Sequence, residues 1–417
     1  MNHKSSVVPM VILGVLFFIF GFVTWLNGSL IPYLQIICHL DAYEALFVSF
    51  SFYIAYTVMA FPMSYLLRWS GYKNGMAIGL WIMALGSLLF IGAAISGAFL
   101  FFLIALFILA TGLTILQSAS NPYIVLLGPI ESAAMRISIM GLINKGAGVL
   151  APILFTYLVF FDAQGIDTNA ELLTSSLIIP YIVMAAILAV LALLVRFSPL
   201  EEIVFDAEDT MDKGNVFAFA HAILGVVALF FYVGIEVIAA DTIGLYAQTL
   251  GVSHATSMTS FTMAFMVVGY IFGIVLIPRY VSQQNALVYS AIFGILFTFG
   301  IVFASEDSFA ITQTLWGFTS LMLLPDSLFF VALLGFANAL VWPSIWPLAL
   351  RGVGQYTAQV SALLIMAIAG GAVLPLVFGK LTLYVSEMRY AYLMGLVCYI
   401  FILCYGLWWH KKTSWRD

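Results

Sequence analysis

Long stretches without charged residues dominate this sequence and constrain its fold more than any other feature. Only 8% of the 417 residues are charged and 64% are hydrophobic, whereas an ordinary soluble domain has about 25% charged residues. Lipid offers no water to unpaired backbone groups, so each long apolar stretch is expected to form a helix. About 20 residues suffice to cross the hydrocarbon layer. The sequence therefore predicts an all-α polytopic membrane protein.

Twelve apolar segments are long enough to be counted as transmembrane helices. They fall at about 8–33, 44–67, 75–95, 98–126, 137–161, 175–196, 218–249, 258–277, 286–304, 328–350, 356–379 and 389–409. The first is longer than the core of a signal peptide, so we expect it to be retained. A further stretch, 310–324, is too short to span and is expected to lie along the outer membrane surface.

A hydrophilic stretch near the midpoint separates the segments into two groups of six. Residues 198–215 contain six acidic side chains. Arg68 and Asn74 in the first half recur as Arg279 and Asn285 in the second, at a common offset of 211. Internal repeats of this kind are typical of transporters built by duplication. We expect an N-terminal six-helix bundle, a cytoplasmic linker and a C-terminal six-helix bundle, at 1–197, 198–216 and 217–417.

Lysine and arginine predict the orientation of the chain. Eleven of the fourteen fall on one side of the membrane if every segment crosses it. Connections rich in these residues stay in the cytoplasm. Both termini are therefore expected to be cytoplasmic.

The composition excludes several classes of function. A net charge of −5 leaves no basic surface for nucleic acid. The three cysteines lie in or beside apolar segments and the five histidines are scattered, so neither a disulfide framework nor a metal site is indicated. The sequence contains no phosphate-binding glycine loop. We expect no enzyme, no ATPase and no cofactor.

Three ionisable side chains lie inside the apolar segments, where charge is expensive. Lys145 lies nine residues after Arg136, about 13 Å along a helix, near the middle of the membrane. It therefore needs a carboxylate partner or must lose its proton. The candidate partners, Glu236 and Asp241, lie on different faces of an unbroken helix and are not expected to form one acid pair. We expect these three residues to couple transport to a proton or sodium ion; a static buried salt bridge is the alternative.

Side-chain amides and a tryptophan form a second group of candidates. An amide donates and accepts hydrogen bonds at once, which suits neighbouring sugar hydroxyls. Residues four apart share a helix face, and an aromatic face suits the C–H groups of a pyranose ring. Packing between helices is the alternative role for each amide. The candidate substrate-binding residues are Asn27, Gln117, Asn121, Asn144, Asn338 and Trp342.

Several short segments have distinctive sequences. The most specific are 25–32 (WLNGSLIP), 117–123 (QSASNPY) with 127–132 (LGPIES), and 232–236 (YVGIE). In these segments the chain resembles the fucose-galactose-glucose permease branch of the major facilitator superfamily. Segments 25–32, 143–148 (INKGAG) and 241–244 (DTIG) look most like bacterial N-acetylglucosamine permeases within that branch. The resemblance implies a major facilitator fold and a sugar symporter of the bacterial inner membrane, whose two six-helix bundles rock about a central site.

The chain also departs from fucose permease, which has Asn-Asp where this chain has Asn27-Gly28, and a glutamate at the position of Gln117. Those carboxylates are the family's proposed proton and sugar groups. A sugar-binding glutamine corresponds to Gly141, and a tyrosine to Trp342. Fucose is therefore not the expected substrate. We expect a monomeric symporter that couples a proton, or sodium, to a neutral hexose or N-acetylhexosamine such as N-acetylglucosamine, glucose or galactose. Uncoupled transport and a non-transporting sugar sensor are the alternatives.

Overall fold

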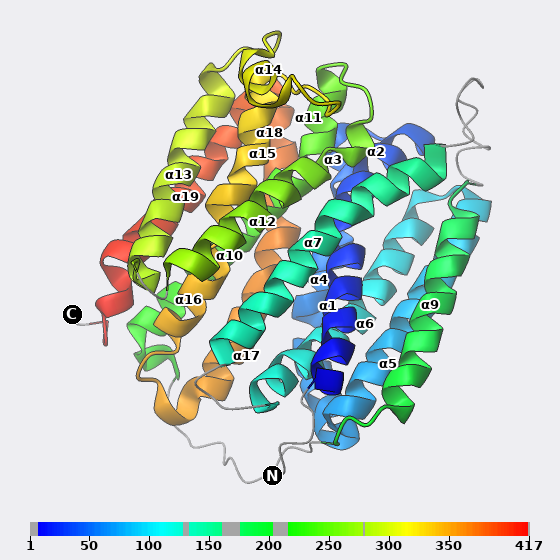
Figure 1. The fold of residues 1–417 in the computed structure, drawn as a ribbon, viewed down its shortest axis with the longest axis vertical. Helices are drawn as coiled ribbons and strands as arrows, with labels where there is room; N and C mark the ends of the chain where they lie inside the picture. Colours follow the sequence, from blue (N-terminus) through cyan, green and yellow to red (C-terminus); the bar gives the residue numbers. More distant parts are fainter. Residues whose placement is uncertain (1–6, 128–132, 161–175, 203–215, 278–279, 416–417) are drawn as a thin grey trace.

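Helices arranged side by side make up the structure, a computed structural model that describes residues 7–127, 133–160, 176–202, 216–277 and 280–415. Within these ranges no strand is formed. The helices run between an upper and a lower end in Figure 1, with the first half of the chain at the right and the second half at the left. The start of α1 lies toward the lower end, and the C label lies at the left edge of the view.

The first half of the described chain contains eight helices. They are α1 (Val7–Trp25), α2 (Asn27–Ile37), α3 (Ala42–Ala45), α4 (Phe47–Val58), α5 (Ala60–Ser96), α6 (Phe99–Leu126), α7 (Ala133–Phe160) and α9 (Ile178–Phe197).

The second half contains ten α-helices and six short 3₁₀ turns in its described residues. The helices are α10 (Ala220–Asp241), α11 (Ile243–Thr249), α12 (Thr259–Leu276), α13 (Gln283–Phe303), α14 (Ala310–Trp316), α15 (Asp326–Asn338), α16 (Val341–Ala349), α17 (Thr357–Met366), α18 (Gly370–Thr382) and α19 (Met394–Leu407). The turns are η3 (Val216–Ala218), η4 (Ala255–Ser257), η5 (Gly354–Tyr356), η6 (Ala367–Ala369), η7 (Met388–Leu393) and η8 (Trp409–Lys411).

Eleven helical stretches of the described chain are long and apolar enough to cross a membrane. The remaining expected span, at 44–67, is built from α4 and the first part of α5, which are separated at Met59. Helix α5 then turns at Gly71, whose φ of 77° is one that glycine adopts readily because it has no Cβ. The rest of α5 crosses back as the third span. The prediction of twelve helices is confirmed, with the second span interrupted.

The helices form two bundles that meet along two seams. In the first bundle α1 packs on α7, and α5 packs on α6 and α9. In the second, α10 packs on α18, and α12 and α13 pack on α15. The seams are α7 against α12 and α4 against α18. The predicted architecture of two six-helix bundles is confirmed.

The short surface helix is also present. Helix α14 lies at the upper end in Figure 1, and the Asp326 carboxylate accepts a hydrogen bond of 3.0 Å from the Ile311 N–H at its start. Residues 203–215, most of the expected linker, lie outside the described residues, as do 128–132 of one family-like segment. The domain boundaries at 197 and 217 therefore stay predictions.

Candidate functional site

Two spans are interrupted where the bundles meet. The first span breaks at Leu26, between α1 and α2, and the seventh breaks at Thr242, between α10 and α11. The two breaks touch: a Cβ added at Gly28 would lie 2.9 Å from the Ala240 carbonyl oxygen. Interrupted helices at corresponding positions of the two halves mark the substrate region in many transporters. The residues around these two breaks are therefore candidates for the substrate site.

An ion pair near the middle of α7 joins the two bundles. The Lys145 ammonium on α7 lies 2.7 Å from Glu236 Oε1 on α10, and their side chains are only 10% and 8% exposed. The same ammonium lies 4.2 Å from the centroid of the Trp25 ring. The Trp25 indole N–H in turn donates to Asn144 Oδ1 at 3.4 Å. Lys145 thus has the carboxylate partner that its burial requires, and that partner is Glu236 rather than Asp241.

Tyrosine hydroxyls surround the Glu236 charge. Those close enough to interact with it belong to Tyr53, Tyr232, Tyr270 and Tyr399, from α4, α10, α12 and α19. Tyr399 also donates a hydrogen bond of 2.9 Å to Asn338 Oδ1, which ties Asn338 to this group. The ring of Trp342 lies 6.4 Å from that of Tyr232. Asn338 and Trp342 thus each contact a tyrosine that lies near Glu236: Asn338 contacts Tyr399, and Trp342 contacts Tyr232.

Asp241 lies apart from that ion pair. Its Oδ2 accepts a hydrogen bond of 2.6 Å from the Ser49 hydroxyl on α4, across the interface between the bundles. Its Oδ1 is buried and has no hydrogen-bond partner among the described residues. The prediction that Glu236 and Asp241 do not form one acid pair agrees with this geometry, because each contacts a different helix of the first bundle.

Several amide groups are buried with hydrogen-bonding capacity left over. The Nδ2 atoms of Asn27, Asn144 and Asn338 and Oε1 of Gln117 have no partner in the described part of the chain. Buried polar groups are normally paired, so such groups are available to a ligand. Gln117 and Asn121 lie on α6, and no hydrogen bond between described residues joins them to the Lys145–Glu236 group. The structure thus brings part of the predicted binding set to the Lys145–Glu236 pair, whereas Gln117 and Asn121 have no hydrogen-bonded link to that pair.

Hydrogen bonds close the bundles against each other above the ion pair. Ser29 donates to the Thr256 carbonyl at 2.6 Å, and the Thr156 and Thr256 hydroxyls bond at 2.8 Å. The Gln248 amide donates to the Pro32 carbonyl at 3.2 Å. Below the ion pair, the described chain shows one long contact, 3.4 Å from Thr57 to the Met366 carbonyl. We call the upper contacts, together with the bond from Ser49 to Asp241, the upper seal.

Two cavities of the described chain lie elsewhere. One, of about 420 Å³, is lined by apolar side chains of α10, α17 and η6. The other, of about 110 Å³, lies between α12, α13 and α15. No candidate residue lines either of them. Asn27, Asn144, Asn338 and the Lys145–Glu236 pair are buried outside these two cavities.

The sequence analysis assigns no role to four residues that lie at the site. Trp25 was recognised within a family-like segment but was given no role, although its ring covers Lys145. Trp346 follows Asn338 and Trp342 at the same spacing of four residues, and its ring lies 5.6 Å from that of Trp342. Ser49 and Tyr53 carried no signal, because single hydroxyls are common in apolar helices.

Comparisons with known proteins agree with this architecture. The family model "Major Facilitator Superfamily" matches residues 13–375. The glucose/galactose transporter of Brucella abortus is 32% identical over 416 residues, which cover 97% of this chain and 95% of that protein. The L-fucose-proton symporter of Haemophilus influenzae is 26% identical, covering 97% of both chains.

A solved structure also matches along its full length. The crystal structure of FucP, a transporter captured in the outward conformation, superposes with a TM-score of 0.72 at 23% identity, covering 98% of this chain and 100% of FucP. This likeness shows the fold. The relatives are named as transporters, so the prediction that the chain is not an enzyme is confirmed. The chain belongs to the Major Facilitator Superfamily, in the branch of the fucose, galactose and glucose transporters.

Proposed function

We propose that this chain is a cation-coupled symporter that carries a neutral hexose or N-acetylhexosamine by alternating access. The observation that carries the proposal is the Lys145–Glu236 pair, which joins the two bundles at 2.7 Å in an apolar interior. Ionisable groups inside a membrane protein mark the paths of ions and substrates. The names of the relatives, glucose/galactose transporter and L-fucose-proton symporter, favour a sugar and a proton.

In this proposal amide groups bind the hydroxyls of the sugar and a tryptophan stacks on its ring. The unpartnered amide atoms of Asn27, Asn144 and Asn338 support this role, and so does the position of Trp342 beside Tyr232. The proposed substrate-binding set is Asn27, Gln117, Asn121, Asn144, Asn338 and Trp342. Glucose and galactose are supported by the relatives, and N-acetylglucosamine by the family-like segments of the sequence.

Lys145, Glu236 and Asp241 are the proposed coupling residues. A proton is the favoured ion because one named relative is a proton symporter. Sodium coupling, uncoupled transport and sugar sensing without transport are outcomes that the experiment below separates. We place the protein in the bacterial inner membrane as a monomer, with both termini cytoplasmic and the upper end of Figure 1 facing outward.

Counterflow in proteoliposomes tests the proposal. Vesicles loaded with one unlabelled sugar from a panel of hexoses and N-acetylhexosamines are diluted into labelled sugar, with and without proton and sodium gradients. Entry of label that depends on the internal sugar is expected for at least one member. A panel without counterflow would refute transport of these sugars, and binding without flux would favour the sensor.

The assigned pocket has its own variants. Gln117→Ala and Asn338→Ala each remove one or two neutral hydrogen bonds, each worth about 0.5–1.5 kcal/mol, so the apparent affinity should fall about two- to tenfold or more. Asn285→Ala is the matched control, because Asn285 is exposed at the lower end of α13. Unchanged affinity in both pocket variants would contradict the assignment.

A further inference from the structure

Asp241 is the most completely enclosed carboxylate of the described chain. It is 0% exposed and ends α10 at the break of the seventh span. Its contact with Ser49 joins the two bundles at 2.6 Å. Its second oxygen, Oδ1, is buried without a partner among the described residues. The group is thus both a bridge between the bundles and a polar atom left without a partner.

The neighbours of Asp241 do not neutralise a negative charge. The charged side chain that acts on it is Glu236, which is of like charge and is itself paired with Lys145. The other titratable groups around it are the Tyr53 hydroxyl of α4 and the Tyr392 hydroxyl of η7, which bonds to the adjacent Thr242. Neither is a cation. An anionic Asp241 would be a buried charge without a counter-ion, which is strongly unfavourable.

The helix ends at this break do not supply a net counter-charge. The amino-terminal end of α11, which begins at Ile243, carries partial positive charge, but the last carbonyls of α10 carry partial negative charge, and the two effects oppose each other at Asp241. Those carbonyls already accept hydroxyl donors: Ile238 from Thr242 at 2.7 Å, Ala239 from Thr262 at 3.1 Å and Ala240 from Thr259 at 2.7 Å. The Ile238 carbonyl also accepts from the Thr242 N–H at 3.0 Å, so both of its lone pairs are used.

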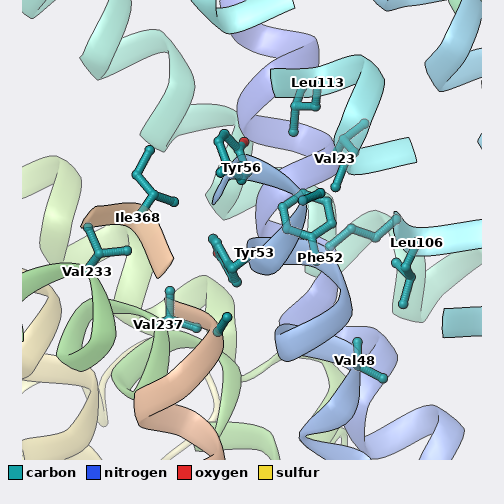
Figure 2. Close-up of a cluster of buried hydrophobic side chains, with 14 of the residues drawn as sticks. Val23, Val48, Phe52, Tyr53, Tyr56, Leu106, Leu113, Val233, Val237 and Ile368 are labelled. Atoms are coloured by element: carbon teal, nitrogen blue, oxygen red, sulfur yellow. The ribbon is translucent and has the colours of Figure 1, made fainter. Parts of the chain in front are cut away.

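Both partners of the contact are enclosed: the side chains of Ser49 and Asp241 are 0% exposed. Figure 2 shows Tyr53 of α4 pointing toward Val237 of α10, so apolar side chains of the two bundles meet beside these helices. Val48 and Phe52 are 0% exposed and Val237 is 1% exposed. Solvent therefore reaches Asp241 only if the bundles separate at this level. A group of this kind is stable as a neutral acid when the seam is closed and as an anion when the seam is open.

We propose that Asp241 is a proton-binding site whose proton holds the upper seal closed, with Ser49 as its partner across the interface. The protonated acid and the Ser49 hydroxyl form a neutral hydrogen bond that the closed bundles tolerate. Loss of the proton leaves an anion that only the hydrated, open conformation accommodates. The inference deepens the proposed symport and rests on it: Asp241 is the group whose protonation accompanies closure of the upper seal.

Hydrogen-deuterium exchange of the purified full-length protein, without sugar, tests the gate directly. Exchange in peptides from α2 and α11, which lie in the upper seal, is followed from acidic to alkaline pH in wild type and Asp241→Asn. The asparagine side chain imitates the neutral acid and cannot lose a proton. Exchange in this variant should therefore depend on pH only through the intrinsic chemistry of backbone N–H exchange. Relative to this variant, wild-type opening should rise by up to about tenfold per pH unit, as expected for one linked proton.

Two further variants distinguish a specific role of the Ser49 hydroxyl from a general loss of stability. Ser49→Ala removes the bond across the interface and should raise exchange in the upper seal about two- to tenfold at acidic pH. Ser51→Ala is the matched control, because Ser51 lies on the same helix but donates to the Leu103 carbonyl within its own bundle. It should leave exchange unchanged. Equal effects of the two variants would overturn the role of Ser49.

The outcomes distinguish this inference from the proposed function. If exchange in the upper seal depended on pH identically in wild type and Asp241→Asn, the proton site would be overturned. The same holds if, at alkaline pH, sodium chloride lowered exchange in the upper seal and potassium chloride did not, since the site would then bind sodium. In proteoliposomes, Asp241→Asn should show less counterflow and less accumulation driven by a pH gradient than wild type, because its upper seal stays closed. Wild-type protein without counterflow for any sugar would refute the symport and leave the gate measurement standing.

Discussion

Removing the carboxylate of the bundle-crossing ion pair should destabilise the closed protein strongly. In Glu236→Gln, the Lys145 ammonium keeps its burial but loses its counter-charge at 2.7 Å. Solvent screening is small because both side chains are about nine-tenths buried. Breaking such a pair from one side costs about 3–5 kcal/mol, equivalent to a shift of about a hundredfold or more in a conformational equilibrium. We expect a lower midpoint of thermal unfolding and loss of concentrative uptake.

A double-mutant cycle provides the assay for this prediction. Thermal-unfolding midpoints are compared in one detergent for Glu236→Gln, Lys145→Met and the double variant, which no longer buries an unpaired charge. The double variant should be more stable than either single variant, because the two losses are coupled. Glu201→Gln, at an exposed position of the lower end, is the control. Additive effects, or a midpoint for Glu236→Gln equal to that of the control, would refute the reasoning.

Two other predictions use side chains at the edge of the site. Gly28→Ala places a methyl group against the Thr259 hydroxyl and the Ala240 carbonyl. The upper seal should therefore fail to close, and counterflow should fall. Gly92→Ala is the control and should be tolerated, because its methyl group would meet nothing within 4 Å. Full activity of Gly28→Ala would contradict the close approach. Tyr399→Phe removes the donor to Asn338 and should change sugar affinity about two- to tenfold. Tyr405→Phe, whose hydroxyl has no described partner, is its control, and equal affinities in the two variants would contradict the link.

The sequence predicted the fold because lipid restricts the backbone to few solutions. Twelve apolar segments and a hydrophilic midpoint led directly to two bundles. The second span is the exception in detail, since it is interrupted at Met59. The interruption lies three residues before Pro62, which has no N–H to bond to the Val58 carbonyl. No proline lies near the break at Thr242, so no sequence pattern predicted it.

The site was predictable only where the energetics of burial left few choices. Lys145 required a carboxylate, because an unpaired ammonium is not stable at that depth, and two candidates existed within the chain. The choice of Glu236 over Asp241 depends on how α10 is rotated against α7, which no sequence pattern records. The partner of Asp241, Ser49, is one of many hydroxyls in apolar helices and becomes identifiable only when the bundles are placed together.

Sugar accumulation against its own gradient is the most direct test of cation-coupled symport. Proteoliposomes with an alkaline interior are supplied with the labelled sugar that shows counterflow, and internal label is followed over time. The account predicts that internal sugar rises above the external concentration and then falls as the pH gradient decays, and that a protonophore abolishes the overshoot. Entry that stops at equal concentrations, with and without proton or sodium gradients, would contradict coupling.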